Sequence, residues 1–162
     1  MERLVDLHVH LDGSLSLETV KELAARQGIE IQNDDILIKK LQVSKDCRDL
    51  NEYLTKFEYP LMLLQTIDSI EYAVYSLMKR QSEQNLLYSE IRFAPQYANK
   101  TGYSQEEYVQ AAIDGMQDAL AKYPSMKAGL ILCCMRGADL REENMETIRQ
   151  TAKYLGSGVC AA

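Results

Sequence analysis

The sequence lacks tryptophan and has only two phenylalanines and three prolines in 162 residues. Hydrophobic residues still make up 46% of the chain, so it can form an aliphatic core, and its composition is not that of a disordered protein. Apolar runs such as 128–135 are far shorter than the roughly 20 residues of a membrane helix. The length predicts one domain, or a substantial part of one.

Positive charge is also in short supply, since 18 Lys and Arg face 24 Asp and Glu, which gives a formal net charge of -6. A chain without a basic excess cannot neutralise many phosphates, which argues against non-specific nucleic-acid binding. The N-terminal residues do not contain the apolar segment of a signal peptide. We therefore expect a cytoplasmic protein that binds neither nucleic acid nor membrane.

The four cysteines, at positions 47, 133, 134 and 160, form no CxxC pair. Cys133 and Cys134 lie in an apolar run, which is typical of small buried side chains, and a disulfide between neighbours is strained. We expect four reduced structural thiols, with Cys133 and Cys134 in the core, as in a reducing compartment.

Short apolar runs alternate with segments of helical periodicity along the chain. Strands are expected over 4–10, 86–94 and 128–135, and a further apolar run occupies 158–162. Helices are expected from the cap Ser16 to Gly28 and over 33–41, and over 46–65 with a kink or restart at Pro60. Further helices follow three capping-box patterns, Asp68 with Glu71, Ser104 with Glu107, and Asp139 with Glu142.

This alternation predicts an α/β fold with a parallel sheet, and the long connection after the first strand predicts a helical insertion. A doubly wound sheet and a (β/α)8 barrel both fit the pattern. Because a barrel takes about 250 residues, residues 1–162 would hold its first three βα units and the start of the fourth strand. The expectation is therefore the N-terminal half of such a barrel.

The two histidines of the chain, His8 and His10, alternate with apolar residues at the end of the first expected strand. Residues two apart in a strand share a face, so both imidazoles can approach one metal ion such as zinc, iron or nickel. Asp12 follows on the same face, and Gly13 allows close backbone approach. Two hydrogen-bonded histidines and a loop-capping aspartate remain the alternative interpretation.

Four ordered segments carry a resemblance to a known family. They are Leu7-His8-Val9-His10-Leu11-Asp12-Gly13-Ser14-Leu15, Leu54-Thr55-Lys56-Phe57, Glu90-Ile91-Arg92-Phe93-Ala94-Pro95 and Ile131-Leu132-Cys133-Cys134-Met135-Arg136. Together they resemble adenosine deaminases, which are zinc-dependent hydrolases built on a (β/α)8 barrel. The resemblance spans essentially the whole chain and agrees with the fold expected from the βα pattern.

The resemblance implies roles for individual residues. His8 and His10 would bind zinc, and His10 would also lie against the substrate. Asp12 would accept a hydrogen bond from the ribose 5′-hydroxyl, and Leu54 and Phe57 would cover the purine. An ordinary amphipathic helix explains Leu54 and Phe57 equally well, and Arg92 and Arg136 are expected to pair with carboxylates.

The family hydrolyses adenosine or deoxyadenosine to the inosine product and ammonia, in purine salvage. Its general acid/base and the rest of its metal shell belong to later strands, so no catalytic residue is assigned within 1–162. We therefore expect this chain alone to be inactive and to pair with the missing C-terminal half or to self-associate.

Three alternatives remain open. An adenine deaminase is disfavoured because the short Asp12 leaves room for ribose. A His-x-His metal phosphoesterase is disfavoured because no Arg or Lys cluster lies near the motif to hold phosphate. A half-barrel without catalysis, acting by self-association, is the third.

Overall fold

The computed structural model describes residues 3–137 and 139–162 and is built around one sheet of four parallel strands. The strands are β1 (Leu4–His10), β2 (Leu86–Phe93), β3 (Lys127–Leu132) and β4 (Val159–Ala161). Their spatial order is β1-β2-β3-β4, so each strand lies beside the next one in the sequence. This order has no reversal, which excludes a doubly wound sheet among the described strands and matches a β/α barrel.

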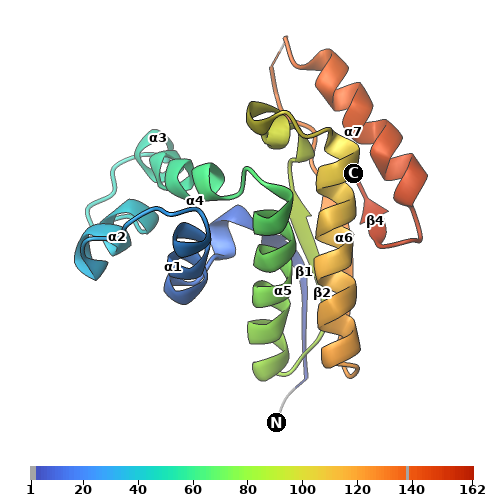
Figure 1. The fold of residues 1–162 in the computed structure, drawn as a ribbon, viewed down its shortest axis with the longest axis horizontal. Helices are drawn as coiled ribbons and strands as arrows, with labels where there is room; N and C mark the ends of the chain where they lie inside the picture. The colour runs from blue at the N-terminus through green and yellow to red at the C-terminus, as the bar shows by residue number, and fades with distance from the viewer. Residues whose placement is uncertain (1–2, 138) are drawn as a thin grey trace.

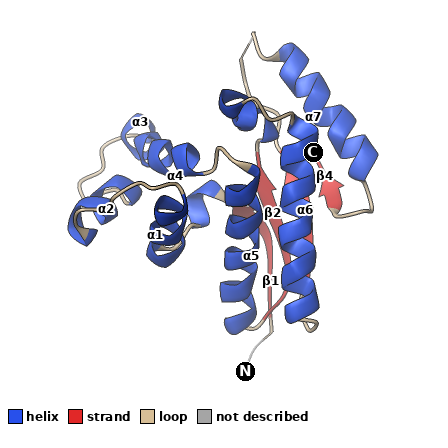
Figure 2. Ribbon diagram, in the orientation of Figure 1, coloured by secondary structure: helices blue, strands red, loops and turns tan. Residues whose placement is uncertain are grey.

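Three long helices follow β1, β2 and β3 and cover one face of the sheet (Figures 1 and 2). They are α5 (Ile67–Glu83), α6 (Gln105–Lys122) and α7 (Arg141–Tyr154). Helices α5 and α6 run side by side, and their apolar stripes pack on the strands through Ile70, Val74, Val109 and Ile113. Below, the inner face of the sheet means the face opposite these helices.

The predicted insertion after β1 is confirmed, and it lies to one side of the sheet in Figure 1. It contains α1 (Leu17–Arg26), α2 (Asp34–Leu41), α3 (Leu50–Leu54) and α4 (Glu58–Leu63). The side chains of Ser16 and Asn33 accept hydrogen bonds from the amides of Thr19 and Asp35, so the predicted starts of α1 and α2 are confirmed.

The helix expected over 46–65, with a kink or restart at Pro60, is instead two short helices, α3 and α4. A 3-10 turn, η2 (Thr55–Phe57), separates α3 from α4 and places the break ahead of Pro60. Pro60 lies in the first turn of α4, where a backbone N–H would have no helical partner, so it does not interrupt the helix.

Two of the three predicted capping boxes do not start their helices. The Thr66 side chain caps α5 by accepting from the amide of Ser69, so Asp68 already lies inside the helix. Helix α7 begins after Leu140 without a side-chain cap, so Asp139 is not its N-cap. Ser104 and Glu107 do form the reciprocal capping box of α6.

Strand β1 has its predicted bounds but is less buried than its alternation implies. Val9 is 6% exposed and Leu11 is fully buried, whereas Val5 and Leu7 are 58% and 56% exposed. The cause is that β1 pairs only with β2 among the described strands, so its other edge has no neighbour there.

The prediction of a cysteine core is wrong. Strand β3 ends at Leu132, so Cys133 and Cys134 follow it in the next connection, where Cys133 is half-buried and Cys134 is exposed. Cys160 is exposed on β4 and Cys47 is half-buried, and all four are free thiols. No helix in the described part of the chain is long and apolar enough to span a membrane.

Candidate active site

Both histidines lie at the carboxyl end of β1, on the inner face of the sheet. His10 is in register with Arg92 at the end of β2, and the Leu11 amide continues the ladder by donating to the Arg92 carbonyl at 3.0 Å. Val9 and Ile91 alternate with these polar residues and are buried against the helices. The alternation of apolar and polar residues along β1 and β2 therefore places the polar side chains at the carboxyl-terminal edge of the sheet, where parallel βα proteins bind ligands.

The two imidazoles converge. Their Nε2 atoms are 3.3 Å apart, and the ring centroids are separated by 5.2 Å with the planes tilted by 43°. Two nitrogens that each lie about 2.0–2.1 Å from a tetrahedral zinc ion are about 3.3–3.4 Å apart. The pair therefore fits two positions of a zinc shell. The described residues contain no cluster of three or more His, Cys, Asp or Glu that could complete it.

Electrostatics keep His10 in the form that binds metal. Burial lowers the pKa of His10, and the positive charges of Arg92 and His8 act in the same direction, while Asp12 opposes them. The ring is therefore neutral at pH 7, with a nitrogen lone pair available.

Asp12 follows β1 in the 3-10 turn η1 (Asp12–Ser14), where its Oδ1 accepts a hydrogen bond of 2.9 Å from the Gly13 amide. Burial raises the pKa of Asp12, opposed mainly by this hydrogen bond and by the charge of His10. Gly13 packs closely against the insertion, because a Cβ at this position would lie 3.2 Å from the Phe57 ring and the ring would have to shift by a few tenths of an ångström.

A cavity of about 400 Å³ opens beside His10 and is mainly apolar. It is lined by His10, Asp12, Leu54, Phe57, Leu61, Phe93, Ala94, Tyr97, Cys133 and Met135. The structure therefore brings together His10, Asp12, Leu54 and Phe57, all named from the sequence. His8 does not line this cavity, but its Nε2 lies 3.3 Å from the Nε2 of His10, which does.

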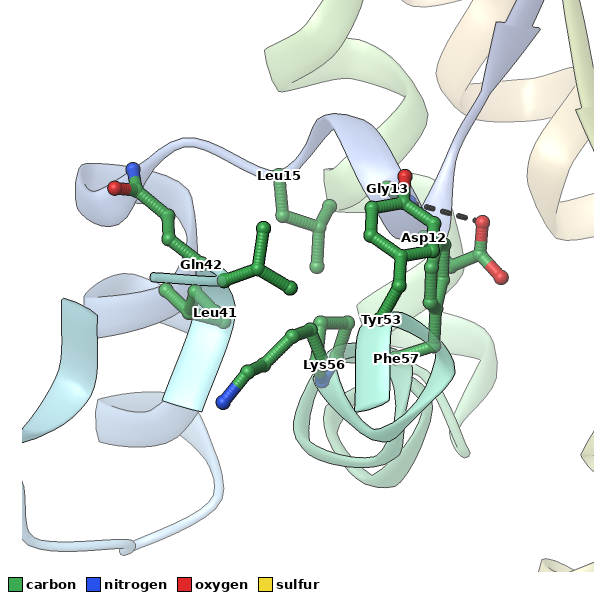
Figure 3. Close-up of a pocket in the computed structure, with 10 residues that line it drawn as sticks. Asp12, Gly13, Leu15, Leu41, Gln42, Tyr53, Lys56 and Phe57 are labelled. Carbon is green, nitrogen blue, oxygen red and sulfur yellow. Dashed lines mark hydrogen bonds between the residues drawn. The ribbon is translucent and has the colours of Figure 1, made fainter. Parts of the chain in front are cut away.

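The insertion lines the cavity beside His10 through Leu54, Phe57 and Leu61. Figure 3 shows a second cavity, of about 260 Å³, and Asp12 and Phe57 line both cavities. The Phe57 ring is held by an edge contact with Tyr53, at a centroid distance of 5.5 Å. Lys56 is anchored to α2, since its Nζ donates to the Lys39 carbonyl at 2.8 Å.

Six lining residues were not assigned to the site from the sequence, and Leu61, Tyr97 and Met135 are among them. Leu61 follows Phe57 by four residues, so the helical spacing of Leu54 and Phe57 contained a signal for it. Met135 lies inside one of the four family-like segments, next to Arg136. Tyr97 follows β2 in the turn η3 (Pro95–Thr101), and we find no sequence signal for its place in the cavity.

Met135 is held in place by α7. The Asn144 side chain accepts from the Met135 amide at 2.8 Å and donates to the Met135 carbonyl at 2.7 Å. Gln96 donates to the Asn144 oxygen at 3.1 Å, which ties the segment after β2 to the same group. This wall of the cavity is therefore positioned by a side-chain network.

The expected carboxylate partners of Arg92 and Arg136 are not found among the described residues. Arg92 Nε instead donates to the Cys133 sulfur at 3.3 Å, and its Nη1 lies 3.1 Å from Nε2 and 3.3 Å from Nδ1 of His8. Arg136 is exposed.

Comparison with known proteins agrees with this geometry. The family model described as adenosine deaminase matches residues 4–162. The chain belongs to the adenosine deaminase family. An adenosine deaminase of Haemophilus ducreyi is 46% identical over 154 residues, which cover 94% of this chain and 45% of the relative. One of Clostridium perfringens is 37% identical, over 97% of this chain and 47% of the relative.

The fold is shared with solved deaminase-type structures. A Burkholderia ambifaria amidohydrolase with bound Zn has a TM-score of 0.77 at 19% identity, covering 98% of this chain and 43% of that chain. An Arthrobacter aurescens adenine deaminase gives 0.74 at 17% identity, covering 99% and 57%. Arabidopsis ADAL complexed with GMP gives 0.76 at 22%, covering 99% and 49%. The chain thus spans about half the length of the curated adenosine deaminases it matches.

Proposed function

We propose that this chain supplies the metal-binding and substrate-facing first half of a zinc-dependent adenosine deaminase. The reaction is the hydrolysis of adenosine or deoxyadenosine to the corresponding inosine and ammonia, a step of purine salvage. The observation that carries the proposal is the convergence of the His8 and His10 Nε2 atoms, 3.3 Å apart, at the rim of a cavity of about 400 Å³.

The metal part rests on the donor set. Neutral imidazoles are preferred ligands of zinc, and the separation of these two matches a tetrahedral edge. Bound zinc supplies Lewis-acid activation of water for attack on the purine carbon that carries the amino group. His8 and His10 hold the ion at the end of β1.

The other proposed site residues bind substrate. His10 and Asp12 contribute the polar side of the cavity, and Asp12 accepts a hydrogen bond from the ribose 5′-hydroxyl. Leu54 and Phe57 cover the purine and exclude water from it. The apolar walls suit a flat heteroaromatic base, and the cavity lining contains neither Lys nor Arg, which disfavours a phosphoester substrate.

A nucleoside is favoured over free adenine. Asp12 is short, and its carboxylate lies in the turn η1, within reach of both cavities around Phe57. This arrangement leaves room for a sugar between the carboxylate and the purine pocket. The curated relatives at 37% and 46% identity are named adenosine deaminase, which supports the same choice.

We propose further that the 162-residue chain alone does not catalyse the reaction. Two imidazoles form only part of a zinc shell, and loss of a general acid/base removes about 10²–10⁴-fold of the rate. Exposed apolar residues on β1 (Leu4, Val5, Leu7) and on α7 (Met145, Ile148) are proposed to contact the remaining half of the barrel or a second copy. The free thiols support a cytoplasmic location.

The decisive experiment joins this chain to the C-terminal part of the Haemophilus ducreyi enzyme. The chimera should deaminate adenosine faster than adenine, as followed by ultraviolet absorbance and ammonia release, while the chain alone should not. His10→Ala should abolish turnover, and Asp12→Ala should raise KM for adenosine more than for adenine. Asp114→Ala, on the exposed face of α6, is the matched control. Equal rates on adenosine and adenine would contradict the choice of a nucleoside.

A further inference from the structure

Arg92 is placed unusually for an arginine on the inner face of the sheet. It is half-buried, and it forms no ion pair with a carboxylate among the described residues. A desolvated guanidinium normally has a carboxylate or another specific partner. Here its close neighbours are the His8 ring and the Cys133 thiol.

The distances to His8 define how the two groups meet. Nη1 of Arg92 lies 3.1 Å from Nε2 and 3.3 Å from Nδ1 of the same ring. A donor in the ring plane that bonded to one nitrogen would be much farther from the other, because their lone pairs point in divergent directions. Two nearly equal distances therefore place Nη1 over the face of the imidazole, and the lone pairs in the ring plane stay accessible.

The other end of the guanidinium is held by Cys133, which directly follows β3. Arg92 Nε donates to the Cys133 sulfur at 3.3 Å, and the Cys133 amide donates to the Phe93 carbonyl at 2.8 Å. Cys133 is thus held beside the end of β2, and it directs the guanidinium across to β1. A chain of contacts therefore runs from Cys133 through Arg92 to His8.

We propose that Arg92 is a positioning residue for His8: its Nη1 lies over the imidazole face of His8 and fixes the ring with the His8 Nε2 turned towards His10. Arginine can contact the His8 ring through Nη1 while its Nε stays bonded to Cys133, whereas lysine has only one nitrogen and cannot make both contacts in this geometry. The positioning of the His8 ring is inferred from the contacts of Arg92 alone. The effect of Arg92 on zinc binding rests on the proposed function.

The test uses the 162-residue chain and the charge-conserving variant Arg92→Lys, with Arg136→Lys as a matched control. Because the chain has only two histidines, their ring signals in ¹H–¹⁵N spectra can be assigned without ambiguity. We expect nuclear Overhauser contacts between the Arg92 side chain and the His8 ring in the parent and in Arg136→Lys. In Arg92→Lys these contacts should vanish and the His8 signals should move more than those of His10.

A second readout is Zn²⁺ affinity, measured by calorimetry on the same proteins. Arg92→Lys should weaken it about ten-fold, as expected for a residue that orients a metal ligand, and Arg136→Lys should leave it unchanged. Cys133→Ala, which retains the guanidinium but removes its anchor, should cause a smaller change in the same direction. This variant keeps the test valid if Arg92→Lys does not fold.

Two results would overturn the inference: no Arg92–His8 contact in the parent spectra, or His8 signals that are the same in Arg92→Lys. Unchanged or tighter Zn²⁺ binding by Arg92→Lys would also contradict it. If the parent chain takes up no Zn²⁺, the zinc part of the proposed function fails, and the ring spectra still decide the role of Arg92.

Discussion

The side chain of Asn144 forms two hydrogen bonds with the backbone of a single residue, Met135, at 2.8 and 2.7 Å. Beyond the end of β3, a side chain of α7 thereby makes the two backbone hydrogen bonds that a neighbouring strand would otherwise make. Met135 in turn lines the larger cavity, so α7 contributes to the shape of the site without touching it directly.

Asn144→Asp should destabilise the chain by about 1–3 kcal/mol, because a carboxylate accepts from the Met135 amide but cannot donate to its carbonyl. Urea unfolding measures the loss. The carboxylate oxygen that replaces the amide nitrogen repels the Met135 carbonyl, so the segment should open more often and the Met135 amide should exchange its hydrogen faster. Asn51→Asp, on the exposed side of α3, is the control. Equal exchange in both variants would show that Asn144 does not hold this segment.

Tyr108→Phe tests a buried link between α6 and the segment after α4. The Tyr108 hydroxyl donates to the Leu64 carbonyl at 2.5 Å, and burial raises the pKa of this phenol far above its usual range. Removal of the donor leaves the carbonyl unsatisfied, at a cost of about 1–3 kcal/mol. Tyr53→Phe, at an exposed ring, should change the free energy of unfolding by far less.

Gly115→Ala tests the closest approach of α5 and α6. A Cβ at Gly115 would lie 2.2 Å from the carbonyl oxygen of Glu71, so the helices must separate. Alanine favours helix by about 1 kcal/mol over glycine, but we expect overpacking to prevail and lower stability by about 1–3 kcal/mol. Thermal unfolding distinguishes overpacking from the gain in helix propensity when Gly115→Ala is compared with Gln117→Ala, a substitution at an exposed position of the same helix. A more stable Gly115→Ala would contradict this packing.

The capping box of α6 should make stability depend on acid pH. Glu107 accepts hydrogen bonds from the backbone amide and hydroxyl of Ser104, which lower the pKa of Glu107. A carboxylate with a lowered pKa stabilises the fold above its unfolded pKa and loses this contribution as the pH falls through its folded pKa. Glu107→Gln should remove that part of the pH dependence of unfolding, and Glu30→Gln should not.

Zinc uptake should depend on the two imidazoles and not on the exposed thiol of Cys134. His8→Ala and His10→Ala should each lower the Zn²⁺ affinity of the chain at least ten-fold, because one imidazole is a poor zinc ligand alone. Cys134→Ser, at an exposed thiol close in sequence, should have no effect. Calorimetry at pH 7 decides between them, and loss of uptake only in the cysteine variant would reject the proposed ligands.

The sequence predicted those elements whose signals are local. The bounds of β1 follow from alternation up to His10, and the caps Ser16, Asn33 and Ser104 act within three residues of themselves. Asp68 failed because Thr66, two residues earlier, caps α5 instead. Local patterns thus predicted which elements exist better than where they start.

The sequence predicted those site residues that lie close to one another within a single segment. His10 and Asp12 share a strand face, and Leu54 and Phe57 share a helical spacing, so each pair could be recognised within a few residues. Tyr97 enters the cavity only because β2 lies beside β1, and the contact of Arg92 with Cys133 spans two strands. Such relationships depend on tertiary packing, and no pattern in the sequence encodes them.

The in-order sheet also has a consequence for how the chain folds. Leu4 pairs with Leu86, whereas Tyr88 pairs with Lys127 and Leu130 with Val159, so the insertion makes the first connection more than twice as long as the others. Each doubling of a loop adds about 0.6 kcal/mol of closure entropy. We expect β2, β3 and β4 to assemble first and β1 to dock last. The two histidines would then meet Arg92 only in the final step of folding.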